Sequence, residues 1–107
     1  MSRIEPYIQL HLWGVRPSAE LEETIATAST HLSPYRKRID RALLHVGRWS
    51  LHHGQGTLFR VTLAVEPAGG GAVISLEEET EVGAPATSLG ALVDTVFQRA
   101  APRLARG

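Results

Sequence analysis

The sequence predicts an α+β fold in which four strands and two helices follow the order β-α-β-β-β-α. Four segments alternate apolar and polar side chains with the two-residue period of a half-buried strand, and two segments repeat apolar side chains at helical spacing. A chain of 107 residues can build one modest core but not two. Residues 1–107 are therefore expected to form a single domain, a two-layer sandwich with both helices on one face of a four-stranded sheet.

The first strand is expected at residues 7–13, where two sets of side chains alternate between its faces. One set is Ile8, Leu10 and Leu12, and the other is Tyr7, Gln9, His11 and Trp13. Gly14 is expected to close the strand.

A helix is then expected to begin after Ser18, whose hydroxyl can accept a hydrogen bond from a free amide of the first turn. Glutamates at positions 20, 22 and 23 suit the positive end of the helix dipole. The residues expected to face the core at helical spacing are Leu21, Ile25, Ala28 and Leu32. Pro34 is expected to end or kink this helix, because the residue before a proline disfavours helical dihedral angles.

The remaining strands are expected at residues 41–50, 57–65 and 72–82. The clearest of them is 57–65, in which Phe59, Val61, Leu63 and Val65 alternate with Arg60, Thr62 and Ala64. Glycine-containing turns at 52–56 and 69–71 predict hairpins between these strands. The connection through the first helix, by contrast, is expected to join parallel strands.

The last helix is expected to begin after Ser88 as its N-cap. Its apolar stripe consists of Leu89, Leu92, Val93, Val96 and Phe97. Pro102 is expected to bend or end the helix, which would leave a basic tail containing Arg103 and Arg106.

Composition removes several classes of function. The chain contains no cysteine, which excludes disulfides, thiolate metal sites and thiol nucleophiles. The N-terminal segment lacks the apolar core of a signal peptide, and charges interrupt every stretch long enough to span a bilayer. A cytoplasmic protein without a membrane partner is expected.

Charge is sharply segregated along the chain although its formal net charge is zero. Residues 36–60 contain six positive side chains and one negative, whereas residues 61–98 contain six negative side chains and no positive one. Phosphate responds to the local field and to counterion release more than to total charge. We therefore expect folding to gather the basic residues of the middle and of the tail into one electropositive surface suited to a polyanion.

The residues that suggest catalysis or metal binding do not form a recognisable site, and we expect neither an enzyme nor a cofactor or small-molecule substrate. His52 and His53 are neighbours and would point to opposite sides of an extended chain, so no metal site is expected there. These two histidines are better suited to stacking or to contact with phosphate. The glutamates at 77, 79 and 81 share one strand face and are expected to be solvated. No GxSxG motif occurs, and the glycines at 69–71 do not lead from a strand into a helix.

Three stretches together resemble one known family and cover nearly the whole chain. Residues 8–21 read IQLHLWGVRPSAEL, residues 52–77 read HHGQGTLFRVTLAVEPAGGGAVISLE, and residues 88–104 read SLGALVDTVFQRAAPRL. They resemble the first strand and helix entry, the second hairpin and the closing helix of the ribosome hibernation-promoting factor family, also called ribosome-associated inhibitor A or protein Y.

The resemblance implies a short-form hibernation factor that binds the small ribosomal subunit under stress. Members of the family lie in the channel of messenger and transfer RNA, and they inhibit translation by steric exclusion. Arg and Lys contacts to ribosomal RNA phosphates would hold such a protein, since RNA of this kind is recognised by shape and backbone. The chain ends at Gly107 without the further domain that pairs ribosomes in longer members, so pairing by that route is not expected.

This chain departs from the family in where its positive charge lies. Members line the first helix with lysines, whereas Thr24, Thr27 and Thr30 occupy that region here. The basic residues lie instead in the segment 35–41, in the strand after it and in the tail. The RNA-binding residues expected from these positions are Arg36, Lys37, Arg38, Arg41, Arg48, His52, His53, Arg60, Arg99, Arg103 and Arg106.

An alternative function is that of a diverged regulatory or adaptor domain that binds a protein partner. Its binding surface would be the exposed face of the sheet, where Tyr7, His11 and Trp13 are expected beside Thr62. Aromatic side chains of this kind are enriched at protein interfaces.

Overall fold

The computed structural model describes residues 4–50, 56–81 and 89–106. Its elements are β1 (Ile8–Trp13), α1 (Ala19–Ser29), the 3₁₀ helix η1 (Thr30–Arg38), β2 (Ile39–Ser50), β3 (Thr57–Pro67), β4 (Ile74–Glu81) and α2 (Leu89–Arg106). The predicted α+β class and element order are confirmed. The strand bounds differ from the predicted ones by one or two residues at most ends.

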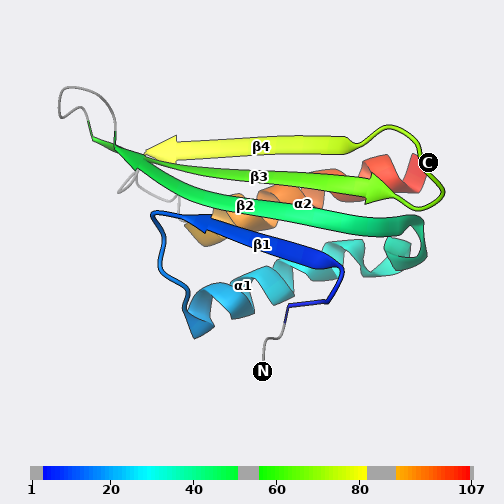
Figure 1. The fold of residues 1–107 in the computed structure, drawn as a ribbon, viewed down its shortest axis with the longest axis horizontal. Helices are drawn as coiled ribbons and strands as arrows, with labels where there is room; N and C mark the ends of the chain where they lie inside the picture. Colours follow the sequence, from blue (N-terminus) through cyan, green and yellow to red (C-terminus); the bar gives the residue numbers. More distant parts are fainter. Residues whose placement is uncertain (1–3, 51–55, 82–88, 107) are drawn as a thin grey trace.

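The four strands form one mixed sheet in the order β1-β2-β3-β4. The strand β1 runs parallel to β2, and the connection between them passes through α1 and η1. The pairs β2–β3 and β3–β4 are antiparallel, as hairpins require. Figure 1 shows both helices on one face of the sheet, so its other face carries no helix. We call this second face the open face.

The core lies between the sheet and the helices. The buried strand residues are those expected from the two-residue alternation, among them Ala42, Leu44, Val46, Val61, Leu63 and Val65. The helices contribute Leu21, Ile25, Ala28, Leu32, Leu92, Val93, Val96 and Phe97, also as their spacing predicted.

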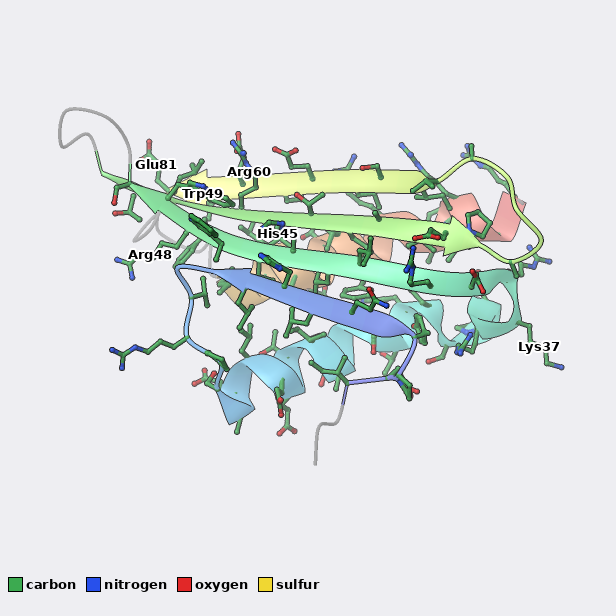
Figure 2. All side chains as sticks on the ribbon, in the orientation of Figure 1. Lys37, His45, Arg48, Trp49, Arg60 and Glu81 are labelled. Atoms are coloured by element: carbon green, nitrogen blue, oxygen red, sulfur yellow. The ribbon has the colours of Figure 1, made fainter. Side chains whose placement is uncertain are left out.

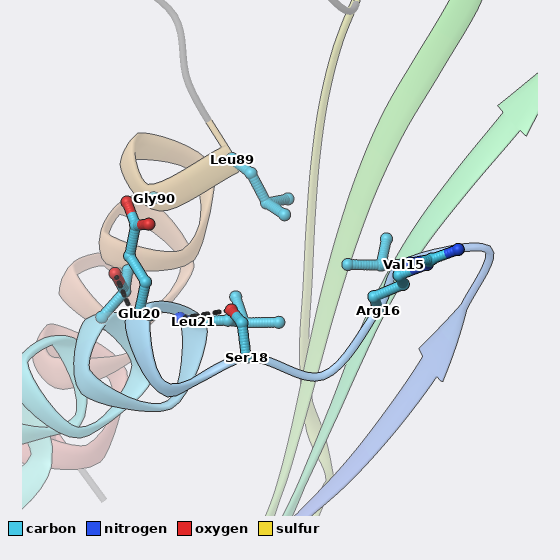
Figure 3. Close-up of a pocket in the computed structure, with 8 residues that line it drawn as sticks. Val15, Arg16, Ser18, Glu20, Leu21, Leu89 and Gly90 are labelled. Carbon is cyan, nitrogen blue, oxygen red and sulfur yellow. Dashed lines mark hydrogen bonds between the residues drawn. The ribbon is translucent and has the colours of Figure 1, made fainter.

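The predicted cap of the first helix is confirmed. The backbone amide of Leu21 donates to Ser18 Oγ at 3.0 Å, and Ser18 itself has an extended backbone. Figure 3 shows this bond at the edge of a small hollow between the starts of α1 and α2. The hollow is lined by both Arg16 and Glu20, so it does not favour an anion or a cation. The predicted cap of the last helix, Ser88, lies outside the described residues.

Pro102 does not end the last helix, because α2 continues to Arg106. That part of the prediction is wrong. A proline removes one helical hydrogen bond and crowds the preceding turn. Here the flanking residues Ala100 and Leu104 are buried, so core packing holds the last turn in place although Pro102 itself is exposed.

Pro34 was also expected to end or kink its helix, and here the α-helical geometry does end before the proline. The α-helix ends at Ser29, and the chain continues through Pro34 as a 3₁₀ helix to Arg38. The tighter turn uses i→i+3 bonds, which suit short connecting segments. The segment before β2 is therefore ordered as a helix and presents its three consecutive cations in the last turn.

Tyr7 does not lie on the exposed sheet face, and this expectation was wrong. The strand β1 begins one residue later, and the Tyr7 ring is buried with the core residues. The rest of the expected face is present, since His11 and Trp13 of β1 are exposed. His11 lies opposite His45 of β2, and His45 in turn lies opposite Thr62 of β3.

Candidate nucleic-acid interface

The helix η1 ends in three exposed cations, Arg36, Lys37 and Arg38. Arg38 reaches across to the end of α2, where its Nη1 donates to the carbonyl oxygens of Leu104 at 2.8 Å and of Ala105 at 3.2 Å. The last carbonyls of a helix have no partner within the helix and carry its negative dipole end, so a guanidinium stabilises them. This contact holds the basic segment of η1 against the last turn of α2.

The same contact forms one wall of a hollow of about 360 Å³. The lining residues come from the end of η1, from the adjoining ends of β3 and β4 with the turn between them, and from α2. They are Lys37, Arg38, Pro67, Ala68, Gly70, Ile74, Arg103 and Leu104. The turn is fixed to η1 by the Ala68 amide, which donates to the Arg38 carbonyl at 2.8 Å. We call this hollow, together with the neighbouring Arg106 at the end of α2, the basic end.

The basic end is electropositive because three cations line the hollow and none of its lining residues carries a carboxylate. Within the part of the chain that the structure describes, Lys37, Arg38 and Arg103 form no ion pair. A concave site with unneutralised cations attracts phosphate, and Arg can bind it in a bidentate manner. Sequence reasoning predicted these cations but missed the wall formed by Pro67, Ala68 and Ile74.

Arg36 lies next to the basic end but also has a structural role. Its guanidinium carbon lies 4.4 Å from the centroid of the Tyr7 ring, and its Nη1 donates to the Ile39 carbonyl at 3.1 Å. Burial raises the pKa of the Tyr7 phenol above its usual value of 10.0, and the positive charge of Arg36 acts in the opposite direction. The cation–π contact with the Tyr7 ring and the bond to the Ile39 carbonyl hold Arg36 against the fold.

Three of the predicted RNA-binding arginines are paired with glutamates. Arg41 Nη2 lies 2.7 Å from Glu66, Arg99 Nη1 lies 2.6 Å from Glu78, and Arg60 Nε lies 2.9 Å from Glu79 and 3.2 Å from Glu77. Exposed pairs of this kind contribute little to stability, but they cancel the field that phosphate would feel. The expectation of one continuous electropositive surface therefore fails for these three arginines.

One further predicted arginine, Arg48, does not join the basic end. Arg48 is exposed near the end of β2, far along the molecule from Lys37, and Figure 2 shows the two labels at opposite ends. His52 and His53 lie outside the described residues. Among the described residues, the structure therefore brings together Lys37, Arg38 and Arg103, which Arg36 and Arg106 accompany in the sequence. It pairs Arg41, Arg60 and Arg99 with glutamates and places Arg48 at the other end of the molecule.

The described residues do not meet what a metal site or a membrane-spanning helix requires. Within residues 4–50, 56–81 and 89–106, no three His, Asp or Glu side chains gather as they would around a metal ion. None of the helices in these ranges has the length and apolar character needed to cross a bilayer.

No protein-family model matches the sequence, and no curated protein matches it either. Solved structures do match. A ribosomal subunit interface protein from Coxiella burnetii has 19% sequence identity and a TM-score of 0.68, over 92% of this chain and 93% of that one. The N-terminal domain of Thermus thermophilus Protein Y has 16% identity and a TM-score of 0.63, over 92% of this chain and 96% of that one. This chain has the fold of both proteins. The fold implied by the sequence resemblance is thereby confirmed.

Proposed function

We propose that this protein is a ribosome-associated translation inhibitor of the cytoplasm, and that it binds the small ribosomal subunit through its basic end. The observation that carries the proposal is the meeting of Lys37, Arg38 and Arg103 in one hollow without a carboxylate. Ribosomal RNA presents dense phosphate at its surface, and a concave cationic site complements it. The shared fold with a ribosomal subunit interface protein supports this choice of polyanion.

The mechanism we propose is steric. The molecule measures 45 × 30 × 22 Å, so a copy held at one end by phosphate contacts projects a rigid sheet-and-helix body over the neighbouring surface. When that surface is the channel of messenger and transfer RNA, the body excludes both ligands and translation stops without a chemical step. Release requires only that the phosphate contacts break, because the protein and the RNA remain covalently unchanged.

Competition on isolated small subunits tests this function. Fluorescently labelled messenger RNA is bound to small subunits, and the protein is added at rising concentration. We expect messenger RNA to be displaced in parallel with the sedimentation of the protein with the subunit. Binding of the protein without any loss of messenger RNA or of initiator transfer RNA would contradict the blocking mechanism, and absence of binding would contradict the ribosomal role.

A further inference from the structure

The open face carries a cluster of rings and apolar groups that the basic end does not use. Trp13 is 56% exposed and Leu43 is 39% exposed, both high values for large apolar side chains. The rings of His11 and His45 have centroids 4.7 Å apart, and those of His45 and Trp49 lie 6.1 Å apart. We call these five residues the open-face patch.

A glycine at position 47 allows the Trp49 ring of the patch to lie against the sheet. A Cβ atom on Gly47 would lie 2.1 Å from two carbons of the Trp49 ring, which no real structure tolerates. The indole therefore occupies the space above Gly47. The guanidinium carbon of Arg60 lies 5.2 Å from the centroid of the same ring, so the patch already holds one arginine by a cation–π contact.

The charge around the open-face patch has the sign opposite to that of the basic end. The charged side chains of the open face are Arg41, Arg60, Glu66, Glu77, Glu79 and Glu81, which leaves a net negative charge. Both arginines are engaged with glutamates, and Glu81 forms no ion pair with any described residue. Figure 2 shows Trp49, Arg60 and Glu81 at the end of the molecule opposite Lys37.

This combination of aromatic rings and carboxylates selects the class of partner. Carboxylates repel the phosphates of a nucleic acid, so stacking of bases on these rings would work against the local field. Arginine and lysine, by contrast, are attracted both by exposed aromatic faces and by carboxylates. A hollow of about 310 Å³ beside the patch, lined by His11, Leu43 and His45 among others, offers space for an aliphatic side chain.

We propose that the open face binds an extended segment of another protein that is rich in arginine or lysine and contains aliphatic residues. The cations would lie over Trp13 and beside Glu81, and an aliphatic side chain would enter the hollow next to Leu43. The rings of His11 and His45 form part of the wall of that hollow, and the aliphatic side chain would pack against them. This site is independent of the proposed ribosomal role.

The test uses the fact that both tryptophans of the chain, Trp13 and Trp49, lie in the open-face patch. Indole emission therefore reports on this face and not on the basic end. The probe is a short synthetic peptide of arginine, leucine and glycine, and a peptide with glutamate in place of arginine is its control. We expect a saturable change in emission with the arginine peptide alone. The double variant Trp13→Ala/Glu81→Gln, which keeps Trp49 as reporter, is expected to bind about fivefold more weakly.

Matched variants separate this surface from the rest of the molecule. Glu20→Gln removes one carboxylate from the exposed start of α1, and Lys37→Ala/Arg103→Ala alters the basic end; both are expected to keep the affinity for the arginine peptide. Unchanged affinity in Trp13→Ala/Glu81→Gln would overturn the proposal. So would an equal response to the glutamate peptide, or an emission change with a single-stranded RNA oligonucleotide that is lost in Trp13→Ala, since that result would assign the face to nucleobases.

Discussion

The double variant Lys37→Ala/Arg103→Ala is expected to bind small ribosomal subunits about tenfold more weakly or worse at physiological salt. Both side chains line the hollow of the basic end, and neither forms an ion pair with a described residue. Their charge is therefore available to phosphate. Arg38 is left intact because it also caps α2 through Leu104, and its loss would confuse binding with stability. Co-sedimentation with purified subunits measures the effect.

The control is Arg41→Ala/Arg99→Ala, which changes the net charge by the same amount. These two arginines are already paired with Glu66 and Glu78 at 2.7 and 2.6 Å. Their removal is expected to change the affinity by no more than about twofold. Equal losses in the two double variants would show that binding depends on total charge alone, and the basic end would then have no special role.

Replacing Phe97 by alanine is expected to lower the free energy of unfolding by about 3–5 kcal/mol. Phe97 is fully buried in α2 and is among the largest buried side chains of the core. Alanine would leave a cavity between the helix and the sheet that the packed neighbours cannot fill. A domain of ordinary stability, about 5–15 kcal/mol, would lose a large share of it.

Urea denaturation followed by circular dichroism measures this loss. Gln98→Ala, one residue further along the same helix and exposed, is the control and is expected to change the stability by about 0.5 kcal/mol or less. A loss below about 1 kcal/mol in Phe97→Ala would contradict the packing described for α2.

Much of the fold follows from local pattern. The alternation in Val61, Leu63 and Val65 identifies a buried strand face, and the Ser18 hydroxyl marks the start of a helix. These predictions succeed because strand and helix periodicity, and capping chemistry, are set by residues close in sequence. The likeness to one family extended the local pattern to the whole topology.

The errors arise where distant contacts decide. Pro102 does not end α2, since Leu104 beyond it is buried in the core and Arg38 caps the last carbonyls. Pairing of Arg60 with Glu79 depends on the register of β3 and β4, which places these residues opposite each other. Charge segregation along the sequence therefore overstates charge segregation in space, and the basic end is smaller than the basic content of residues 36–60 suggested.

The most direct test of the account locates the basic end on the ribosome. The natural chain has no cysteine, so a single introduced cysteine carries an iron–EDTA probe at one defined place. Ala105→Cys places the probe at the exposed end of α2 beside Arg106, and Gln9→Cys places it on the exposed sheet face. We expect strong, localised hydroxyl-radical cleavage of small-subunit RNA from position 105 and weak cleavage from position 9. Equal cleavage from both positions, or stronger cleavage from position 9, would contradict binding through the basic end.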